Sequence, residues 1–160
     1  MEQMLLAMGR ELASSQNGRD PAPTLRVIVE GTRREKRANI REEIYRIARE
    51  LLRNTYRHAH ARSIEAELRY DADAFVLLVR DDGKGIDPQV LKEHGRAGHW
   101  GLRGLYERAE GMGARLDIWS EAGAGTEARL TVPGAIAYEK SGRGGRFKLF
   151  RKTRIYEHRS

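Results

Sequence analysis

One stretch of the chain, residues 41–61 (REEIYRIARELLRNTYRHAHA), limits the fold more than any other. Apolar residues recur there three and four positions apart, and at about 100° per residue this spacing places them on one face of a helix. Such a face is stable only when it packs against a second layer. We therefore expect a long buried helix over about residues 40–60, whose apolar stripe consists of Ile40, Ile44, Ile47, Ala48, Leu51, Leu52, Thr55 and Ala59.

Three polar side chains lie along one edge of that stripe. Asn54 projects within about 20° of Ile47, Glu50 lies one turn before Asn54, and His58 projects into the stripe itself. An amide or carboxylate that is buried without a partner costs about 1–3 kcal/mol. This edge therefore needs a polar network in the core, a rotation towards solvent, or a ligand.

The remaining pattern predicts a sheet with further short helices. Alternating and β-branched residues predict strands, and short turns join four of them into two hairpins. The first strand is expected at an edge, whereas the almost wholly apolar strand at 74–80 is expected in the centre. The element order predicts an α+β fold, a two-layer α/β sandwich with a mixed sheet and helices on one face. The expected strands are residues 25–31, 63–70, 74–80, 114–120 and 126–133, and the expected helices begin at Pro88 and Leu102.

The flanking segments are expected to be accessory to one domain at residues 25–135. Residues 1–24 are interpreted as a short helix and a linker, left from a trimmed segment or lying on the surface. Residues 136–160 are interpreted as a basic tail that packs loosely. The charged run at 32–37 is expected to be a solvated loop.

Composition narrows the classes of function. The chain has no cysteine, which excludes thiolate metal sites and cysteine nucleophiles. No apolar run approaches the length of about 18 residues that a membrane span needs, and we expect a cytoplasmic segment without membrane contact. The formal net charge of +7 suits a polyanion, either a nucleic acid or the phosphates of a nucleotide.

A glycine-rich loop, EHGRAGHWG at 93–101, leads into the helix that begins at Leu102. A loop of this kind exposes backbone N–H groups and the positive end of the helix dipole, which together bind phosphate, although plain surface loops share the pattern. Its spacing fits neither a P-loop nor a dinucleotide fingerprint. The glycines that would allow an anion to approach are Gly98, Gly101 and Gly104, and Arg103 would add positive charge.

A second loop, DDGKGID at 81–87, follows the buried strand. Asp81 can aim its carboxylate at an amino group of a flat base, with glycines leaving room for the ring; a plain turn is the alternative, and further calcium ligands are missing. Asn54 offers an amide oxygen to Mg²⁺, which takes few protein ligands. Glu50, one turn away, is placed to orient or deprotonate a nucleophile.

Three segments resemble, in order and spacing, the N, G1 and G2 boxes of one ATP-binding domain. They are RELLRNTYRHAHA, DDGKGID and GHWGLRGLYERAEGMGARLDIWSEAGAGTEARLTVP. The domain is shared by histidine kinases, gyrases, heat-shock chaperones and mismatch-repair ATPases, and is called the GHKL or Bergerat fold. The likeness covers roughly residues 25–140. It looks closest to the catalytic domain of LuxR/NarL-associated sensor histidine kinases, in particular those with a periplasmic β-propeller sensor region.

The resemblance implies a sandwich with a left-handed βαβ unit that binds Mg²⁺ and ATP beneath a lid at about residues 89–101. It implies that Glu50 assists phosphoryl transfer and that Asn54 holds Mg²⁺ through the phosphates. Asp81 would accept the adenine amino group, with Thr126 supporting the adenine end. The other implied contacts with ATP are Arg57, His58, Gly83, Gly85, Ile86, Gly98, Gly101, Leu102, Arg103 and Gly104.

The resemblance also implies partners: an acceptor histidine on a two-helix dimerisation segment, and then a response regulator. Residues 1–24 contain no histidine. We therefore expect no autophosphorylation by this chain alone, and interpret it as an excised catalytic domain, a truncated product or a stand-alone ATPase that needs a partner. The smaller or aliphatic residues usual beside the asparagine are replaced by Leu52-Arg53 and Thr55-Tyr56. We expect Arg53 to lie in solvent and Tyr56 to alter the packing.

Two other interpretations stay open. One is a serine kinase of the anti-sigma-factor type, which shares the fold but fits the GHWGLRG context less well. The other is a regulatory or nucleic-acid interaction module that uses the basic tail. Such a module could have a degenerate nucleotide pocket. The motif residues argue against degeneracy because they are intact: Asn54, Asp81, Gly83 and Gly85. We do not expect nucleic acid to be the partner.

Overall fold

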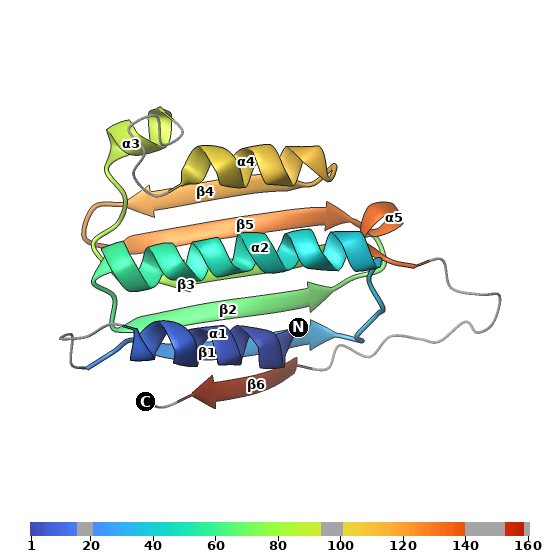
Figure 1. Cartoon of the computed structure of the whole chain (residues 1–160), viewed down its shortest axis with the longest axis horizontal. Helices are drawn as coiled ribbons and strands as arrows, with labels where there is room; N and C mark the ends of the chain where they lie inside the picture. The colour runs from blue at the N-terminus through green and yellow to red at the C-terminus, as the bar shows by residue number, and fades with distance from the viewer. Residues whose placement is uncertain (16–20, 94–100, 140–152, 159–160) are drawn as a thin grey trace.

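One six-stranded sheet, covered on one face by helices, organises the chain (Figure 1). The computed structural model describes residues 1–15, 21–93, 101–139 and 153–158. The strands are β1 (Thr24–Gly31), β2 (Ser63–Tyr70), β3 (Ala74–Asp81), β4 (Arg115–Glu121), β5 (Gly125–Pro133) and β6 (Thr153–His158). The helices are α1 (Glu2–Ser14), α2 (Ala38–Asn54), the π-helical turn η1 (Thr55–Ala59), α3 (Pro88–Lys92), α4 (Leu102–Gly111) and α5 (Gly134–Ala137).

The sheet is mixed, with the strand order β4-β5-β3-β2-β1-β6. β1 and β2 are parallel, and every other neighbouring pair is antiparallel. Figure 1 shows β1 and β2 pointing the same way, with β2 above β1 and α2 crossing in front of the sheet, so this connection is left-handed. Nearly all such crossovers in proteins are right-handed. The expected two-layer α+β sandwich is confirmed, and its left-handed unit is present.

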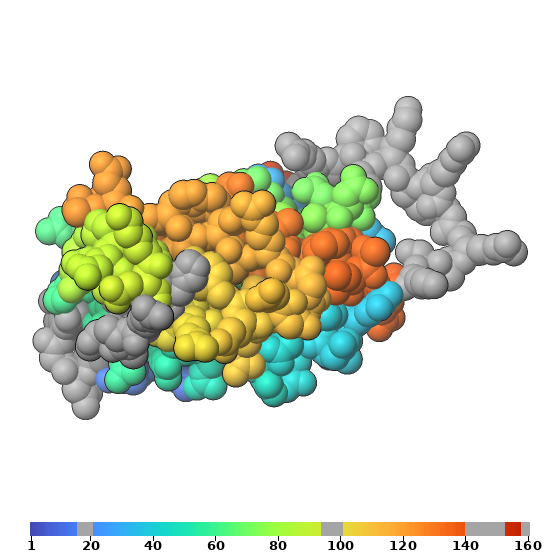
Figure 2. Space-filling model, turned by 90° about the horizontal axis from the view of Figure 1, so that it is seen from above, coloured from blue at the N-terminus to red at the C-terminus, as the bar shows by residue number. Residues whose placement is uncertain are grey.

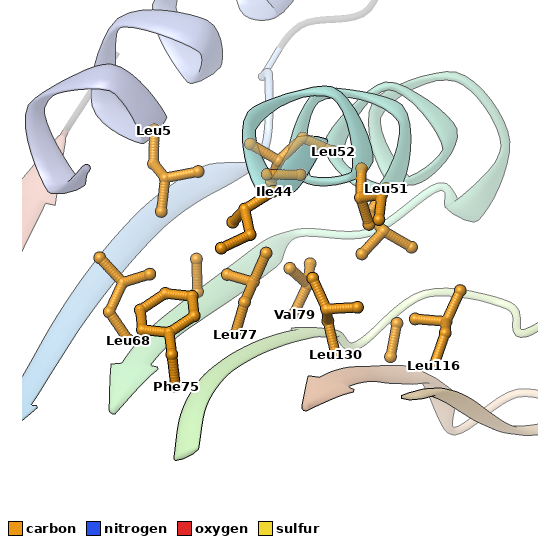
Figure 3. Close-up of a cluster of buried hydrophobic side chains, with 14 of the residues drawn as sticks. Leu5, Ile44, Leu51, Leu52, Leu68, Phe75, Leu77, Val79, Leu116 and Leu130 are labelled. Atoms are coloured by element: carbon orange, nitrogen blue, oxygen red, sulfur yellow. The ribbon is translucent and has the colours of Figure 1, made fainter. Parts of the chain in front are cut away.

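The core lies between the helices and the sheet (Figure 3). Ile44 and Leu52 of α2 point towards the sheet, where Phe75 and Leu77 of β3 meet them. Leu5 of α1 is fully buried beside them, so the helix within residues 1–24 contributes to the same core. Burying a side chain of this size stabilises the fold by about 1.5–3 kcal/mol.

The prediction that residues 25–31 form an edge strand is wrong. β1 lies between β2 and β6, and Val27 faces Tyr156 across the β1–β6 pair. The hydroxyl of Tyr156 accepts a hydrogen bond from Arg33 at 3.4 Å. β6 comes from the basic tail that we expected to pack loosely, and its polar, exposed residues suit an edge strand. The tail therefore supplies the edge of the sheet and satisfies the backbone groups of β1.

The charged run at 32–37 is likewise not a solvated loop throughout. Lys36 is only 6% exposed, and its ammonium group lies 4.2 Å from the ring centres of both Tyr70 and Phe75. Burial lowers the pKa of Lys36 from 10.5 to about 8. Arg34 stacks on the ring of Tyr138 at 4.0 Å. Through these cation–π contacts, residues 32–37 pack against the end of the sheet opposite the loop at 81–87.

The carboxyl end of the long helix departs from α-helical geometry. α2 ends at Asn54, and η1 continues it to Ala59 before His60 adopts a left-handed conformation with φ of 52°. π-helical turns occur frequently at functional sites. None of the described helices combines the length and the apolar composition that a membrane crossing requires.

Candidate functional site

A small cavity lies where the end of α2, the end of β3, the start of β5 and the start of α4 meet. Its volume is about 20 Å³, close to that of a single water molecule. Leu102, the first residue of α4, forms one wall and is 1% exposed. As it stands, the cavity is too small for a flat base. The lining residues are Leu51, Asn54, Thr55, Val79, Asp81, Ile86, Leu102, Ile118, Thr126 and Ala128.

Asp81, the last residue of β3, supplies the carboxylate of this cavity. Its Oδ1 atom accepts a hydrogen bond from the backbone N–H of Gly83 at 2.9 Å, and the hydroxyl of Thr55 lies 3.4 Å from Oδ2. Burial raises the pKa of Asp81, whereas the hydrogen bonds from Gly83, Thr55 and Thr126 oppose that shift. An ionised carboxylate only accepts hydrogen bonds, so the group suits a ligand with an N–H donor.

Ser120 is a member of the site that the sequence interpretation missed. It faces Thr126 across β4 and β5, and Thr126 in turn faces Asp81 across β5 and β3. The hydroxyl of Ser120 accepts a hydrogen bond from the backbone N–H of Ile86 at 2.7 Å. The alternation Leu116, Ile118, Ser120 along β4 was the available signal, because it places a hydroxyl on the helix-covered side of the sheet.

The DDGKGID loop is held by close backbone contacts on both sides. A Cβ atom at Gly83 would lie 2.2 Å from the carbonyl oxygen of Ala59, and one at Gly85 would lie 2.5 Å from that of Glu121. The φ of Gly85 is +79°, which other residues rarely adopt. The N–H of Lys84 donates to the Ala59 carbonyl at 2.7 Å. The loop thus rests on the π-helical turn on one side and on the β4–β5 hairpin on the other.

Asn54 and Glu50 line the side of the site formed by α2. Asn54 is 7% exposed and borders the cavity. Glu50 forms an ion pair with Arg53 at 2.8 Å, and its Oε1 atom would lie 3.0 Å from a Cβ atom at Gly101. Gly101 is the N-cap of α4, so the Glu50 carboxylate faces the start of that helix. Arg53 is exposed as expected, and Tyr56 is 2% exposed within the core.

No group of three or more histidine and acidic side chains among the described residues is arranged to hold a metal ion. The donor set fits a different arrangement, in which the buried amide of Asn54 assists an ion that ligand phosphates hold.

The other described residues implied by the resemblance are not among those that line the cavity. Arg103 pairs with Glu107 at 2.8 Å and faces an open groove between α3, α4 and β4, elements that Figure 2 shows along one edge of the molecule. Among the described residues, no atom outside the local helix backbone lies within 4 Å of a Cβ atom placed on Gly104. Arg57 is exposed and His58 is partly buried in η1. Gly98 lies outside the described residues.

Sequence comparisons agree with this geometry. The family described as histidine kinase-, DNA gyrase B-, and HSP90-like ATPase matches residues 39–136, more than half of the chain. A sensor-like histidine kinase of Chloroflexus aurantiacus is 33% identical over 112 residues, which cover 67% of this chain and 19% of that protein. The sensor histidine kinase YdfH of Bacillus subtilis is 36% identical over 93 residues, which cover 58% of this chain and 22% of that protein. The chain thus spans about a fifth of the length of these relatives.

Solved structures show the same fold. The blue-light activated histidine kinase of Erythrobacter litoralis EL346 superposes with a TM-score of 0.62 at 23% identity, over 82% of this chain and 40% of that one. The fold, the ordered segments and the family match agree, and the matched region contains the long helix, the DDGKGID loop and the β4–β5 hairpin. The chain belongs to the family of histidine kinase-, DNA gyrase B-, and HSP90-like ATPases.

Proposed function

We propose that this chain binds Mg²⁺-ATP and acts as the catalytic domain of a sensor histidine kinase. The γ-phosphoryl group would pass to a histidine on a separate dimerisation segment. The observation that carries the proposal is the shared cavity of Asp81 and Asn54, which puts a base-binding carboxylate and a buried amide beside the start of α4. The family match and the sensor kinases among the relatives support it.

Adenine would bind against Asp81. Its amino group donates to the carboxylate, and Ile86 packs against the ring. Gly83 and Gly85 allow the close backbone contacts that hold the loop beside the base. Thr126 supports the same edge of the base. Leu102 moves aside to admit the ring, because the cavity is too small for it as it stands. This opening would accompany closure of the lid at about residues 89–101, and such loop motions exclude water from a phosphoryl-transfer site.

The phosphates would lie at the start of α4. Gly101, Leu102, Arg103 and Gly104 surround the N-terminus of this ten-residue helix, where free N–H groups and the helix dipole favour negative charge. Gly98, Arg57 and His58 would complete the phosphate and lid contacts. Arg103 would exchange its partner Glu107 for phosphate.

Phosphoryl transfer depends on positioning and on neutralisation of charge. The ring nitrogen of the acceptor histidine attacks the γ-phosphorus, a P–N bond forms, the P–O bond to ADP breaks, and ADP carries away the electron pair. A bound Mg²⁺, assisted by Asn54, would neutralise charge on the phosphates. Glu50 would orient the nucleophile once it separates from Arg53.

The cellular setting follows from the relatives' names and from the motifs. The proposed partners are the phosphoacceptor segment and then a response regulator, and the proposed location is the cytoplasm. The relatives include the signal transduction histidine-protein kinase/phosphatase DegS of Bacillus subtilis. Within the sensor kinases we assign the chain to the LuxR/NarL-associated group with a β-propeller sensor region, on the GHWGLRG and WSEAGAGTE motifs.

Calorimetry of ATP binding, with and without Mg²⁺, tests the proposal. Asp81→Asn should abolish most of the ATP affinity, because the amide places a donor where the base presents one. Asp73→Asn, on the exposed β2–β3 turn, is the matched control and should bind normally. Asn54→Ala should remove the dependence on Mg²⁺. A folded wild-type chain that binds no ATP would refute the proposal and favour a regulatory interaction module.

A further inference from the structure

Three side chains stand in a row across the sheet at the edge of the cavity. Ser120 of β4 faces Thr126 of β5, and Thr126 faces Asp81 of β3. Facing residues of antiparallel strands have Cβ atoms about 4.5–5.5 Å apart, so each side chain directly neighbours the next. Asp81 and Thr126 line the cavity, whereas Ser120 lies behind Thr126. The direction in which the Thr126 hydroxyl donates its proton therefore depends on Ser120.

The contacts of Ser120 fix which partner supplies each proton. Its Oγ atom lies 2.7 Å from the N–H of Ile86, 3.0 Å from the carbonyl oxygen of Gly125 and 3.0 Å from Oγ1 of Thr126. A backbone N–H only donates and a carbonyl only accepts, while a serine hydroxyl has one proton and two lone pairs. Only one assignment makes all three contacts hydrogen bonds at once, and in it the Ser120 proton goes to Gly125. One lone pair receives the Ile86 N–H, and the other receives the Thr126 proton.

This assignment makes Thr126 an acceptor towards the cavity. Its only hydroxyl proton is engaged with Ser120, so its lone pairs are what it can offer to a ligand. The ionised carboxylate of Asp81 also only accepts. Two neighbouring acceptors match an amino group, which carries two N–H bonds. A carbonyl oxygen at the same place would meet lone pairs on both sides, and the lone pairs that face it would receive no hydrogen bond from the ligand.

We propose that Ser120 is a positioning residue that sets the base selectivity of the site. By holding the Thr126 hydroxyl as an acceptor, it favours a purine with a 6-amino group over one with a 6-oxo group. The inference rests on the proposed nucleotide binding and extends it to the choice of base. Sites that are built to hydrogen-bond a ligand group reject analogues that lack it far more strongly than apolar pockets do.

The test compares ATP with inosine triphosphate, which carries a 6-oxo group in place of the 6-amino group. The measured quantity is the dissociation constant of inosine triphosphate divided by that of ATP, obtained by calorimetry; a high ratio means a preference for ATP. Ser120→Ala frees the Thr126 proton to turn towards a carbonyl, so the preference for ATP should fall by about tenfold. Ser120→Thr keeps a hydroxyl in the row and should retain the wild-type ratio.

The ratio of the two dissociation constants distinguishes a positioning role of Ser120 from a purely structural one. If Ser120 only braces the loop through Ile86, Ser120→Ala weakens both nucleotides equally and leaves the ratio unchanged. Thr126→Val removes the acceptor itself and should lower the ratio even if Ser120→Ala does not fold. In the Thr126→Val background, Ser120→Ala should have no further effect on the ratio.

Two results would overturn the inference, and they are distinguishable. An unchanged ratio in Ser120→Ala and Thr126→Val, together with loss of ATP binding in Asp81→Asn, would reject the role of Ser120 alone. Absence of nucleotide binding by the folded wild-type chain would reject the proposed function and this inference with it.

Discussion

The α carbon of Gly83 lies so close to Ala59 that a Cβ atom there would be 2.2 Å from the Ala59 carbonyl oxygen. The same carbonyl accepts a hydrogen bond from the N–H of Lys84 at 2.7 Å. Because the contact joins two backbones, neither can yield as a flexible side chain would. The loop that carries Asp81 therefore packs directly, backbone against backbone, on the π-helical turn that follows Asn54.

Gly83→Ala should displace the loop from the π-helical turn, because the new Cβ atom would clash with the Ala59 carbonyl oxygen. Overpacking of this kind costs about 1–3 kcal/mol, and the backbone N–H of Gly83 also holds Asp81. We expect a lower free energy of unfolding in urea and a loss of ATP affinity in calorimetry. A variant with wild-type values for both quantities would show that the loop does not pack in this way.

Gly104→Ala should separate stability from phosphate binding. In the part of the chain that the structure describes, no atom outside the local helix lies within 4 Å of a Cβ atom there, so alanine should stabilise α4 by about 0.5–1 kcal/mol. If phosphate approaches this turn closely, ATP affinity should nevertheless fall several-fold. Gly111→Ala, at the other end of α4 and equally unobstructed, is the matched control. Equal ATP binding by the two variants would contradict a phosphate contact at Gly104.

The elements with local signals could be predicted from the sequence. The long helix, both hairpins and the positions of Asp81 and Asn54 follow from periodicity and turn residues that lie close together in the chain. The assignment of their roles came from the resemblance, and those roles remain predictions. Residue types alone left a solvated edge of the helix as a reasonable alternative.

What could not be predicted depends on segments distant in sequence. Lys36 is buried only because Tyr70 and Phe75 present their rings to it. β1 is internal only because β6 arrives from the other end of the chain in the matching register. The direction of the Thr126 proton depends on three partners of Ser120, and no pattern in the sequence reports it.

Lys36→Met should stabilise the fold at neutral pH. Burial lowers the pKa of Lys36 from 10.5 to about 8, so the native state holds its proton less tightly than the unfolded chain does. Protonated Lys36 therefore costs stability at or below pH 8, and the contacts with two rings offset only part of that cost. We expect Lys36→Met to raise the free energy of unfolding by about 1–3 kcal/mol at pH 7.

The sign of this effect gives a pH test. Between about pH 8 and 10.5 the unfolded chain binds more protons, so the wild-type stability rises relative to that of Lys36→Met and the gain disappears. Urea unfolding of both proteins at pH 7, 8, 9 and 10 measures the difference. The exposed Lys92→Met is the control and should show no such trend. A gain that stays constant with pH would contradict the lowered pKa.

Removing the residues after Lys140 should weaken the fold and leave ATP binding unchanged. β6 pairs with β1 at one edge of the sheet, whereas the strands that line the cavity are β3, β5 and β4. Figure 1 shows these three strands towards the other edge. The deletion exposes the backbone of β1 and removes the partly buried Tyr156 side chain, so the free energy of unfolding should fall by about 1–3 kcal/mol.

A second variant distinguishes loss of the strand from loss of the tail's positive charge. Ile155→Pro removes a backbone N–H within β6 but keeps every charged residue, and the Ile155 side chain is 52% exposed, so little core packing is lost. Both variants should unfold at lower urea concentration and bind ATP with the wild-type dissociation constant. If the deletion alone weakens ATP binding, the basic tail attracts the nucleotide electrostatically, and the weakening should then decrease as salt is added.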